Sequence, residues 1–447
     1  MSRFLRVLVG CALCMVAGDL SESAPQKPSA TPKHRVANPQ AQALNHLLDA
    51  AQQAIDRQDY ASAAQDYKDY LAKKPDDATV HYDLGYAYTA LEEPADAKSE
   101  YEKAIALNPK LGPAYQNLGI TLLPDDPAGA VAALQKAAEL LPADARTEWL
   151  LGTALEEDGN FGRAIDQFEA AKKLDANDPE IRTSLGQALL RAGREKEASA
   201  AFQDALALQP KGRTLAAAHL GLARAAITQK QLEEGVSELA AYLQMEPSDA
   251  GARIDRASAL VDLGKEDEAL AELNRAAEHG QEQLRALKLR SQIYWEKKRY
   301  DDALPVLQKA VALAPRDPDL LARLGRVYLQ KKDYPDAVRC LAAAYNMNPN
   351  ANDLLGDAIE AEYLNKNYTE ALAALDALAK REELPLGSWF MRAACYDNLG
   401  DAADALDSYQ KFLQLNKDEN SDMYFIATAR SRVLARELQN NKQKKKR

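Results

Sequence analysis

Small and large apolar residues recur along this chain at fixed places in a period of 34 residues. Residues 318–351 carry the set Leu324-Gly325, Tyr328, Ala337, Leu341, Ala344 and Pro349. Residues 78–111 carry the corresponding set Leu84-Gly85, Tyr88, Ala97, Tyr101, Ala104 and Pro109. Because apolar positions four and seven residues apart lie on one face of a helix, each period predicts a pair of amphipathic helices.

The residue types at these places have a common physical reason. Two antiparallel helices approach closely only where their side chains are small, which explains Gly or Ala at position 8 of the period and Ala at position 20. Tyr, Leu or Phe at positions 11 and 24 fills the space around this contact, and each contributes about 1.5–3 kcal/mol when buried. Proline at position 32 lacks an N–H and ends the second helix. The pattern therefore predicts an all-α chain of repeated helical hairpins.

This pattern resembles the tetratricopeptide repeat family. The resemblance implies a right-handed superhelical solenoid of stacked antiparallel helix pairs, in which neighbouring repeats cover each other's apolar faces. About eleven tandem repeats fit residues 44–419, with the bounds 44–77, 78–111, 112–144, 145–178, 179–212, 216–249, 250–283, 284–317, 318–351, 352–385 and 386–419.

Two places depart from the regular period. The third repeat is one residue short and contains Pro124 and Pro127, which predicts an altered turn between its two helices. About three extra residues near 212–215 separate the fifth repeat from the sixth. The register stays open there, because either Leu220-Gly221 or Leu222-Ala223 could fill positions 7 and 8.

The N-terminal segments have compositions of their own. Residues 1–24 place Arg3 and Arg6 around the start of a short apolar stretch that small residues follow, which predicts a cleaved signal peptide. An alternative is a lipid anchor at Cys11, since the sequence leading to this residue resembles a lipobox. Residues 25–43 are rich in proline and polar residues and predict a flexible tether.

The C-terminal segments follow the array. Residues 420–440 predict a capping helix, which covers the end of the last repeat and turns polar side chains to solvent. Its approximate apolar stripe comprises Phe425, Ala429, Val433, Leu434 and Leu438. Residues 441–447 form a basic tail.

The bulk composition limits the classes of function. The formal net charge of −11 argues against a nucleic-acid binder, and no apolar run reaches the length of about 18 residues that a transmembrane span needs. The chain has five histidines, none of them paired at helical spacing, and it lacks nucleotide-binding and nucleophile motifs. We therefore expect no metal, no cofactor and no catalysis. The isolated Cys340 and Cys395 are expected to be small buried residues.

In the family that the pattern resembles, ligands lie in a concave groove lined by the first helix of each repeat. Projecting these groove positions onto the sequence gives candidate partner-binding surfaces. Repeats two to four offer Tyr82, Tyr86, Gln116, Asn117 and Trp149. Repeats eight and nine offer Arg285, Lys288, Gln292, Trp295, Arg323 and Arg326. Repeat eleven offers Phe390, Met391, Asp397 and Asn398.

The four basic side chains of repeats eight and nine favour a partner that is acidic or bears a carboxylate, since Arg binds a carboxylate through two parallel hydrogen bonds. The competing interpretation is that these cations are solvated or paired with Glu296, Asp319 or Asp353. Chaperone-binding members of the family hold a terminal carboxylate with cations and amides from three successive repeats. The third of these repeats here offers Asp353 and Asp357, whose charge has the wrong sign.

The sequence thus predicts an exported, periplasmic or cell-surface scaffold that binds protein or peptide partners without catalysing a reaction. Two alternatives remain open. The chain could be a structural spacer or a self-assembling component of a cell-envelope complex. It could also be a cytosolic co-chaperone-like adaptor, if the N-terminus is not a signal.

Overall fold

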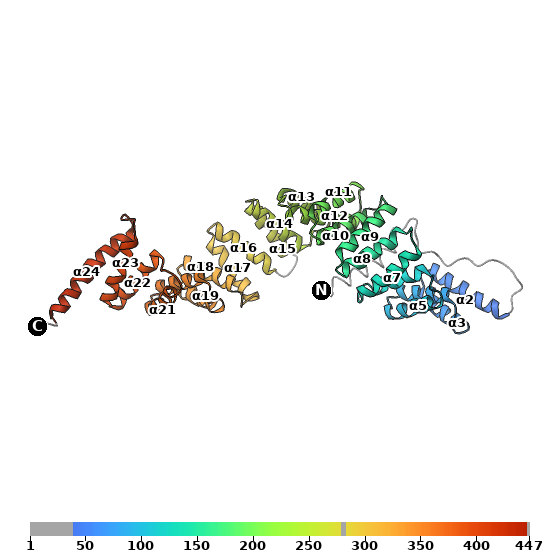
Figure 1. The fold of residues 1–447 in the computed structure, drawn as a ribbon, viewed down its shortest axis with the longest axis horizontal. Helices are drawn as coiled ribbons and strands as arrows, with labels where there is room; N and C mark the ends of the chain where they lie inside the picture. The colour runs from blue at the N-terminus through green and yellow to red at the C-terminus, as the bar shows by residue number, and fades with distance from the viewer. Residues whose placement is uncertain (1–38, 279–282, 445–447) are drawn as a thin grey trace. The chain divides into compact units, whose positions relative to one another are not determined.

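The structure is a computed structural model, and it describes residues 39–278 and 283–444 (Figure 1). The described residues form 23 helices, α2 to α24, and none of them lies in a strand. They make eleven helix pairs followed by one last helix. The predicted all-α fold of about eleven stacked helical hairpins is confirmed.

The helices alternate along the chain between the first and the second member of a pair. The first helices are α2 (Pro39–Asp56), α4 (Ala78–Ala90), α6 (Gly112–Leu122), α8 (Ala145–Glu157), α10 (Pro179–Arg191), α12 (Gly212–Thr228), α14 (Ala250–Asp262), α16 (Leu284–Glu296), α18 (Pro318–Gln330), α20 (Asn352–Leu364) and α22 (Leu386–Leu399). The second helices are α3 (Tyr60–Leu71), α5 (Pro94–Leu107), α7 (Pro127–Leu140), α9 (Phe161–Leu174), α11 (Glu195–Ala207), α13 (Leu232–Met245), α15 (Glu266–Glu278), α17 (Tyr300–Leu313), α19 (Tyr334–Met347), α21 (Tyr368–Ala379) and α23 (Ala402–Leu415). Helix α24 (Asp422–Lys444) follows the last pair. The chain divides into two compact units between Pro247 and Ser248, and within each unit every helix packs on its neighbours in the sequence.

Aspartate side chains mark the start of several first helices. Asp144 Oδ2 accepts a hydrogen bond from the backbone N–H of Thr147 at 3.0 Å, and Asp249 Oδ1 accepts one from Ala252 at 3.0 Å. Such a cap satisfies an N–H that has no partner inside the helix. In α4, α8, α10, α14 and α18 an aspartate cap of this kind marks where the hairpin begins.

The turns inside ten of the eleven described hairpins contain a left-handed residue, and the turn between α6 and α7 of the third hairpin does not. Glycine supplies it at Gly159, Gly193, Gly264 and Gly400, while other residues have a positive φ at Gln58, Glu92, Lys230, Lys298, Lys332 and Lys366. This conformation lets the next N–H bond back into the last helical turn, as Asp333 does to the Tyr328 carbonyl at 2.9 Å. The same turn is thus kept where the sequence offers no glycine.

The left-handed residue settles the open register of the sixth repeat. Lys230 precedes Gly264 by 34 residues, so this repeat begins at residue 216 and Leu222-Ala223 fill positions 7 and 8. Gly221 instead packs against the ring of Phe202 in the preceding repeat. A Cβ on Gly221 would lie 2.2 Å from Phe202 Cζ. The extra residues before the repeat lengthen α12 to 17 residues.

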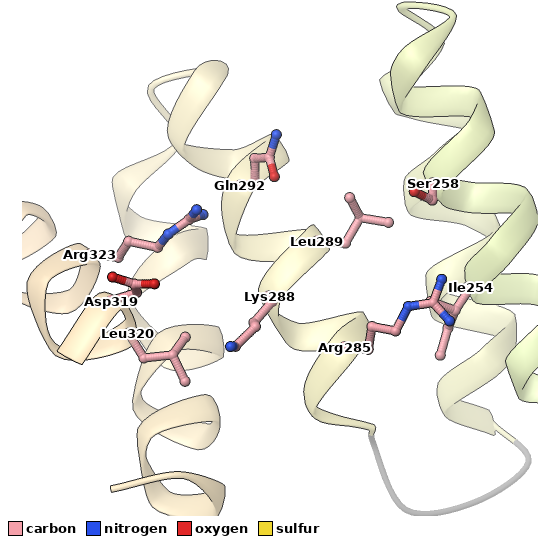
Figure 2. Close-up of a pocket in the computed structure, with 9 residues that line it drawn as sticks. All are labelled: Ile254, Ser258, Arg285, Lys288, Leu289, Gln292, Asp319, Leu320 and Arg323. Carbon is pink, nitrogen blue, oxygen red and sulfur yellow. The ribbon is translucent and has the colours of Figure 1, made fainter. Parts of the chain in front are cut away.

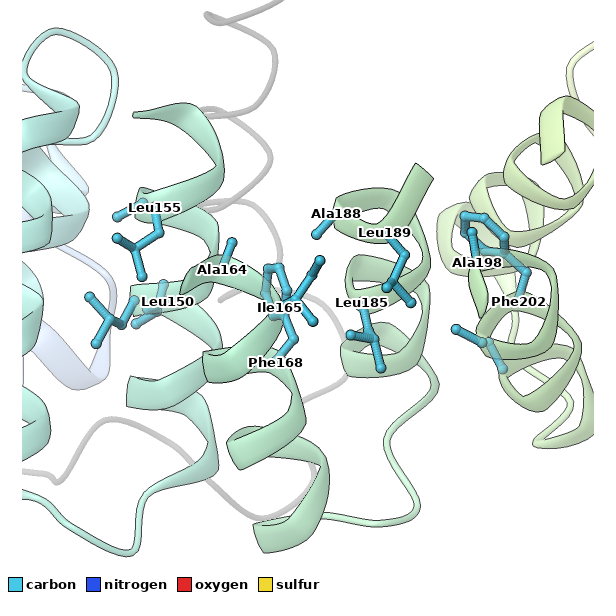
Figure 3. Close-up of a cluster of buried hydrophobic side chains, with 14 of the residues drawn as sticks. Leu150, Leu155, Ala164, Ile165, Phe168, Leu185, Ala188, Leu189, Ala198 and Phe202 are labelled. Carbon is cyan, nitrogen blue, oxygen red and sulfur yellow. The ribbon is translucent and has the colours of Figure 1, made fainter. Parts of the chain in front are cut away.

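The close contact between the two helices of a hairpin is where the sequence places it. A Cβ on Gly152 would lie 2.7 Å from Phe168 Cε1, and a Cβ on Gly186 would lie 2.7 Å from Phe202 Cε1. Both phenylalanines are fully buried. Figure 3 shows how these rings and the leucines of α8 and α10 join one hairpin to the next in a shared apolar core. Each hairpin therefore depends on its neighbours for burial.

The two isolated cysteines are small buried residues, as predicted. Cys340 and Cys395 are free thiols with exposed fractions of 4% and 0%. Burial raises the pKa of the Cys395 thiol to about 11, so the thiol stays protonated at neutral pH.

Several predictions for the chain ends concern residues outside the described ones. These are the signal peptide at 1–24, the alternative lipid anchor at Cys11 and most of the tether at 25–43. Helix α2 already begins at Pro39, within the segment assigned to the tether, and α24 extends past residue 440 into the segment assigned to the basic tail. Within residues 39–278 and 283–444, no helix combines the length and the apolar character that crossing a membrane requires.

Candidate functional site

Two adjoining cavities lie along the first helices α14, α16 and α18 of three successive hairpins. The first has a volume of about 300 Å³ and is lined by Ile254, Ser258, Arg285, Lys288, Leu289, Gln292, Asp319, Leu320 and Arg323 (Figure 2). The second has a volume of about 270 Å³ and is lined by Ser291, Gln292, Trp295, Glu296, Leu307, Arg323 and Arg326. All six side chains that the sequence proposes for repeats eight and nine line these cavities. We call the combined hollow the α16 groove.

Three of the four cations in the α16 groove are held by aspartates. Arg285 Nη2 lies 2.6 Å from Asp255 Oδ1, and Lys288 Nζ lies 2.7 Å from Asp317 Oδ2. Arg326 pairs with an aspartate of the next repeat. The competing interpretation from the sequence, that acidic neighbours pair with these cations, therefore applies to three of them, although mostly through aspartates that the sequence did not single out.

Arg326 bridges two repeats. Its Nη2 lies 2.6 Å from Asp357 Oδ2 and 3.6 Å from Asp353 Oδ2, both on α20. These are the two aspartates that stand where chaperone-binding members of the resembled family need cations. Because they are engaged by Arg326, this end of the groove presents a closed ion pair rather than a site for a terminal carboxylate.

Arg323 differs from the other three cations. It is exposed, lines both cavities and makes no ion pair or hydrogen bond with any residue that the structure describes. Asp319 lies one helical turn before it and lines the first cavity with it (Figure 2). Arg323 thus keeps its hydrogen-bond donors available at the centre of the groove.

The two neutral side chains of the groove are also positioned by contacts. Trp295 is 36% exposed and its ring packs edge-on against Tyr300, with 5.4 Å between the ring centroids. Gln292 Nε2 donates to Glu296 Oε1 at 3.0 Å. Fixed side chains of this kind lose little conformational entropy when a ligand binds.

The ion pairs also fix the charge of the aspartates that accept them. Burial raises the pKa of Asp317, but hydrogen bonds from Lys288 and from the backbone N–H of Leu320 outweigh it and lower the pKa below the usual range. Asp317 therefore stays ionised and caps α18 at the same time. With such aspartates counted, the groove is a mosaic of both signs.

The surface proposed for repeats two to four is held together by hydrogen bonds between successive first helices. Asn117 Nδ2 donates to Tyr82 Oη at 3.4 Å, and Trp149 Nε1 donates to Ser184 Oγ at 2.9 Å. Each of these two bonds joins position 5 of one repeat to position 6 of the next. They leave half-buried rings whose polar atoms are already engaged.

The remaining residues of this surface are engaged in the same way. Gln116 Nε2 donates to Thr147 Oγ1 at 2.8 Å and to Asp144 Oδ2 at 3.1 Å. Tyr86 packs edge-on against Tyr60, with 6.4 Å between ring centroids. The hydrogen bonds of Tyr82, Asn117, Gln116 and Trp149 thus link α4, α6, α8 and α10 in succession, whereas Tyr86 packs on α3.

Two residues of the group proposed in repeat eleven, Phe390 and Asp397, serve the packing of the last helix. Phe390 packs edge-on against Phe412, with 5.4 Å between ring centroids. Asp397 accepts two hydrogen bonds from Arg430 of α24, at 2.7 and 2.6 Å. Asp397 therefore fastens α24 to the array.

Sequence reasoning missed a buried carboxylate beside the first surface. Asp83 is 8% exposed and accepts no hydrogen bond from any described residue. Burial, helped by the negative charge of Asp77, raises its pKa to about 7. No signal in the sequence marks it, because Asp49 and Asp255 occupy the same position of other repeats and are not buried.

Comparison with known proteins gives one family. Two family models, both described as Tetratricopeptide repeat, match the chain. One matches residues 54–119 and 294–344, and the other matches residues 125–180, 151–213, 183–250, 254–318, 322–385 and 367–420. No curated protein sequence matches the chain.

Several solved structures are similar to parts of the chain or to most of it. MamA from Desulfovibrio magneticus RS-1 is 24% identical over 37% of this chain and 95% of that chain, with a TM-score of 0.37. PilF from Pseudomonas aeruginosa is 19% identical over 48% of this chain and 98% of that chain, with a TM-score of 0.41. Yeast Tom70 is 15% identical over 89% of this chain and 99% of that chain, with a TM-score of 0.34.

Proposed function

This chain belongs to the tetratricopeptide repeat family, and we propose that it is an exported scaffold that binds a protein segment in the α16 groove. Arrays of this family act as protein-interaction scaffolds, since stacked repeats present an extended concave surface. The proposal adds a place and a chemistry to that general role. The proposed role is binding without catalysis.

The observation that carries the proposal is Arg323, an exposed cation that lines both cavities and makes no ion pair with any described residue. A carboxylate of the partner would bind its guanidinium with two hydrogen bonds. Gln292 would pair with the backbone of the segment, and the exposed face of Trp295 would cover an apolar side chain. The partner is therefore a protein or peptide with an acidic group. The ion pairs of Arg285 with Asp255 and of Lys288 with Asp317 hold these lining side chains of the α16 groove in place before the partner binds.

Replacing Arg323 by alanine is expected to weaken peptide binding about tenfold or more, because hydrogen bonds to a charged group contribute about 1.5–3 kcal/mol. Peptides selected on the wild-type protein from a random display library would be synthesised with their acidic residues intact and with the corresponding amides. Fluorescence anisotropy then gives the dissociation constants. The acidic peptides should bind more tightly, and this preference should disappear with Arg323→Ala.

Arg316→Ala is the matched control. Arg316 is exposed and lies in the connection before α18, outside both cavities, so the variant loses the same charge at a neighbouring place. We expect it to bind like the wild type. Equal affinity of the wild type and Arg323→Ala for the acidic peptides would contradict the role of the groove.

The export part of the proposal rests on residues 1–24, where basic residues precede a short apolar stretch. After expression with an intact secretion system, mass spectrometry of the intact protein should show the loss of about the first 18–24 residues. A lipid attached at Cys11 would instead give an earlier cleavage and an added acyl mass. Recovery of the protein with Met1 or Ser2 as its N-terminus would show that export by this route does not occur.

A further inference from the structure

The last helix has one face that is firmly docked. Ala427 and Leu434 of α24 are 0% and 2% exposed and pack in an apolar cluster with Tyr409 and Phe412 of α23. The guanidinium of Arg430 also donates two charge-assisted hydrogen bonds to the carboxylate of Asp397. These contacts fix the rotation of α24 about its own axis, and so they fix which residues face outward.

The outward face of α24 is apolar over three turns. Phe425 is 61% exposed, Ile426 is 48% exposed and Val433 is 40% exposed, with the exposed Ala429 between them. No residue that the structure describes covers them. A helix that only ends a repeat array would turn a polar face to solvent, so this face is suited to a further contact.

Charged residues of opposite sign stand at the two ends of this apolar face. Asp422 lies one turn before Phe425, and Arg436 lies one turn after Val433. Both are exposed, and neither makes an ion pair within the described part of the chain. Asp422, Ala429 and Arg436 are seven residues apart, which is the spacing of a helix–helix seam.

The face is complementary to itself. Consider two antiparallel copies of α24 related by a two-fold axis at Ala429. Phe425 of each copy then contacts Val433 of the other. Asp422 then meets Arg436 at both ends of the contact. The small Ala429 stands at the crossing point, where the two helices must approach most closely.

We propose that α24 is the dimerisation helix of this protein, and that a second copy of the chain docks antiparallel on the face formed by Asp422, Phe425, Ile426, Ala429, Val433 and Arg436. The contact is independent of the α16 groove. A lipid surface fits less well, because the apolar residues lie at the acidic end of the helix, beside Asp418, Glu419 and Asp422, rather than among its basic residues.

The size of the contact sets the affinity to expect. A pair of helices touching over about four turns buries less area than a standard protein–protein interface, so a dissociation constant on the order of 10 µM is expected. Sedimentation velocity of the purified full chain over a range of about 1–100 µM, spanning this constant, should therefore show a monomer–dimer equilibrium. A monomer throughout this range would overturn the proposal.

A charge exchange tests the pairing itself. Asp422→Arg and Arg436→Asp each place like charges opposite one another at both ends of the dimer, and each should weaken dimerisation about tenfold. The double variant Asp422→Arg with Arg436→Asp restores opposite charges and should dimerise like the wild type. A double variant as weak as the single ones would overturn the antiparallel register.

A second pair of variants tests the face. Ala429→Glu brings two carboxylates together on the two-fold axis and should leave the protein monomeric at the highest concentration. Ala435→Glu is the matched control, since Ala435 is exposed on α24 away from this face, and it should dimerise normally. Dimers that persist in Ala429→Glu would contradict this assignment of the face. A wild-type monomer that sediments with vesicles of anionic phospholipid, and loses this binding in Ala429→Glu, would assign the face to membrane binding instead.

Discussion

Ala337→Trp is expected to lower the free energy of unfolding by about 3 kcal/mol or more, because overpacking a core already filled to native density strains the side chains and the backbone around it. Ala337 is fully buried on α19 at the place where this helix crosses α18. The space there is already closed, since a Cβ on Gly325 would lie 2.5 Å from Leu341 Cγ. An indole ring at residue 337 must therefore push the two helices apart.

Ala312→Trp provides the control for this substitution. Ala312 lies on the neighbouring α17 and is exposed, so the same ring there should change stability by less than about 0.5 kcal/mol. Urea denaturation followed by circular dichroism measures the stability of both variants. In Ala337→Trp, the unit that begins at Ser248 should unfold at a lower urea concentration than in the wild type. If Ala337→Trp unfolds at the same urea concentration as the wild type, position 20 of the repeat is not the helix crossing.

Asp83→Asn is expected to stabilise the protein at alkaline pH and to have little effect in acid. The pKa of this buried carboxyl is about 7 in the folded protein and near 4 in an unfolded chain. Folding thus favours its protonated form, so its contribution to stability is fully present below about pH 4 and is lost as the pH rises through about 7. Asparagine carries no charge at any pH and avoids this loss.

The size of the effect follows from the same shift. At pH 8 the variant should exceed the wild type by about 1–4 kcal/mol in free energy of unfolding, and near pH 4 the two should be similar. Denaturation curves at several pH values between 4 and 8 measure this difference. Asp49→Asn is the matched control, because Asp49 occupies the same position of the first repeat and is exposed. A difference between Asp83→Asn and the wild type that does not change with pH would show that the buried carboxyl is not the cause.

The sequence alone determined the architecture of this protein. Residues such as Gly186, Ala198 and Phe202 recur in each period because every hairpin must solve the same packing problem, so the pattern could be read without knowing where one hairpin lies relative to the next. The fold, the number of hairpins and the burial of both cysteines follow from this local rule. Six residues of the α16 groove follow from the groove positions of the family that the pattern resembles, since equivalent positions of successive first helices face the same side.

Only the tertiary structure decided how these residues are used. The cations of the groove meet aspartates of adjacent repeats, as Arg285 meets Asp255, and no sequence period states which of them remain unpaired. The apolar stripe expected on the last helix divides for the same reason. Leu434 is buried, whereas Phe425 and Val433 face outward, because the fork of Arg430 onto Asp397 fixes the rotation of α24. A pattern within one helix specifies that a face is apolar, but the contacts with other helices specify which way that face is turned.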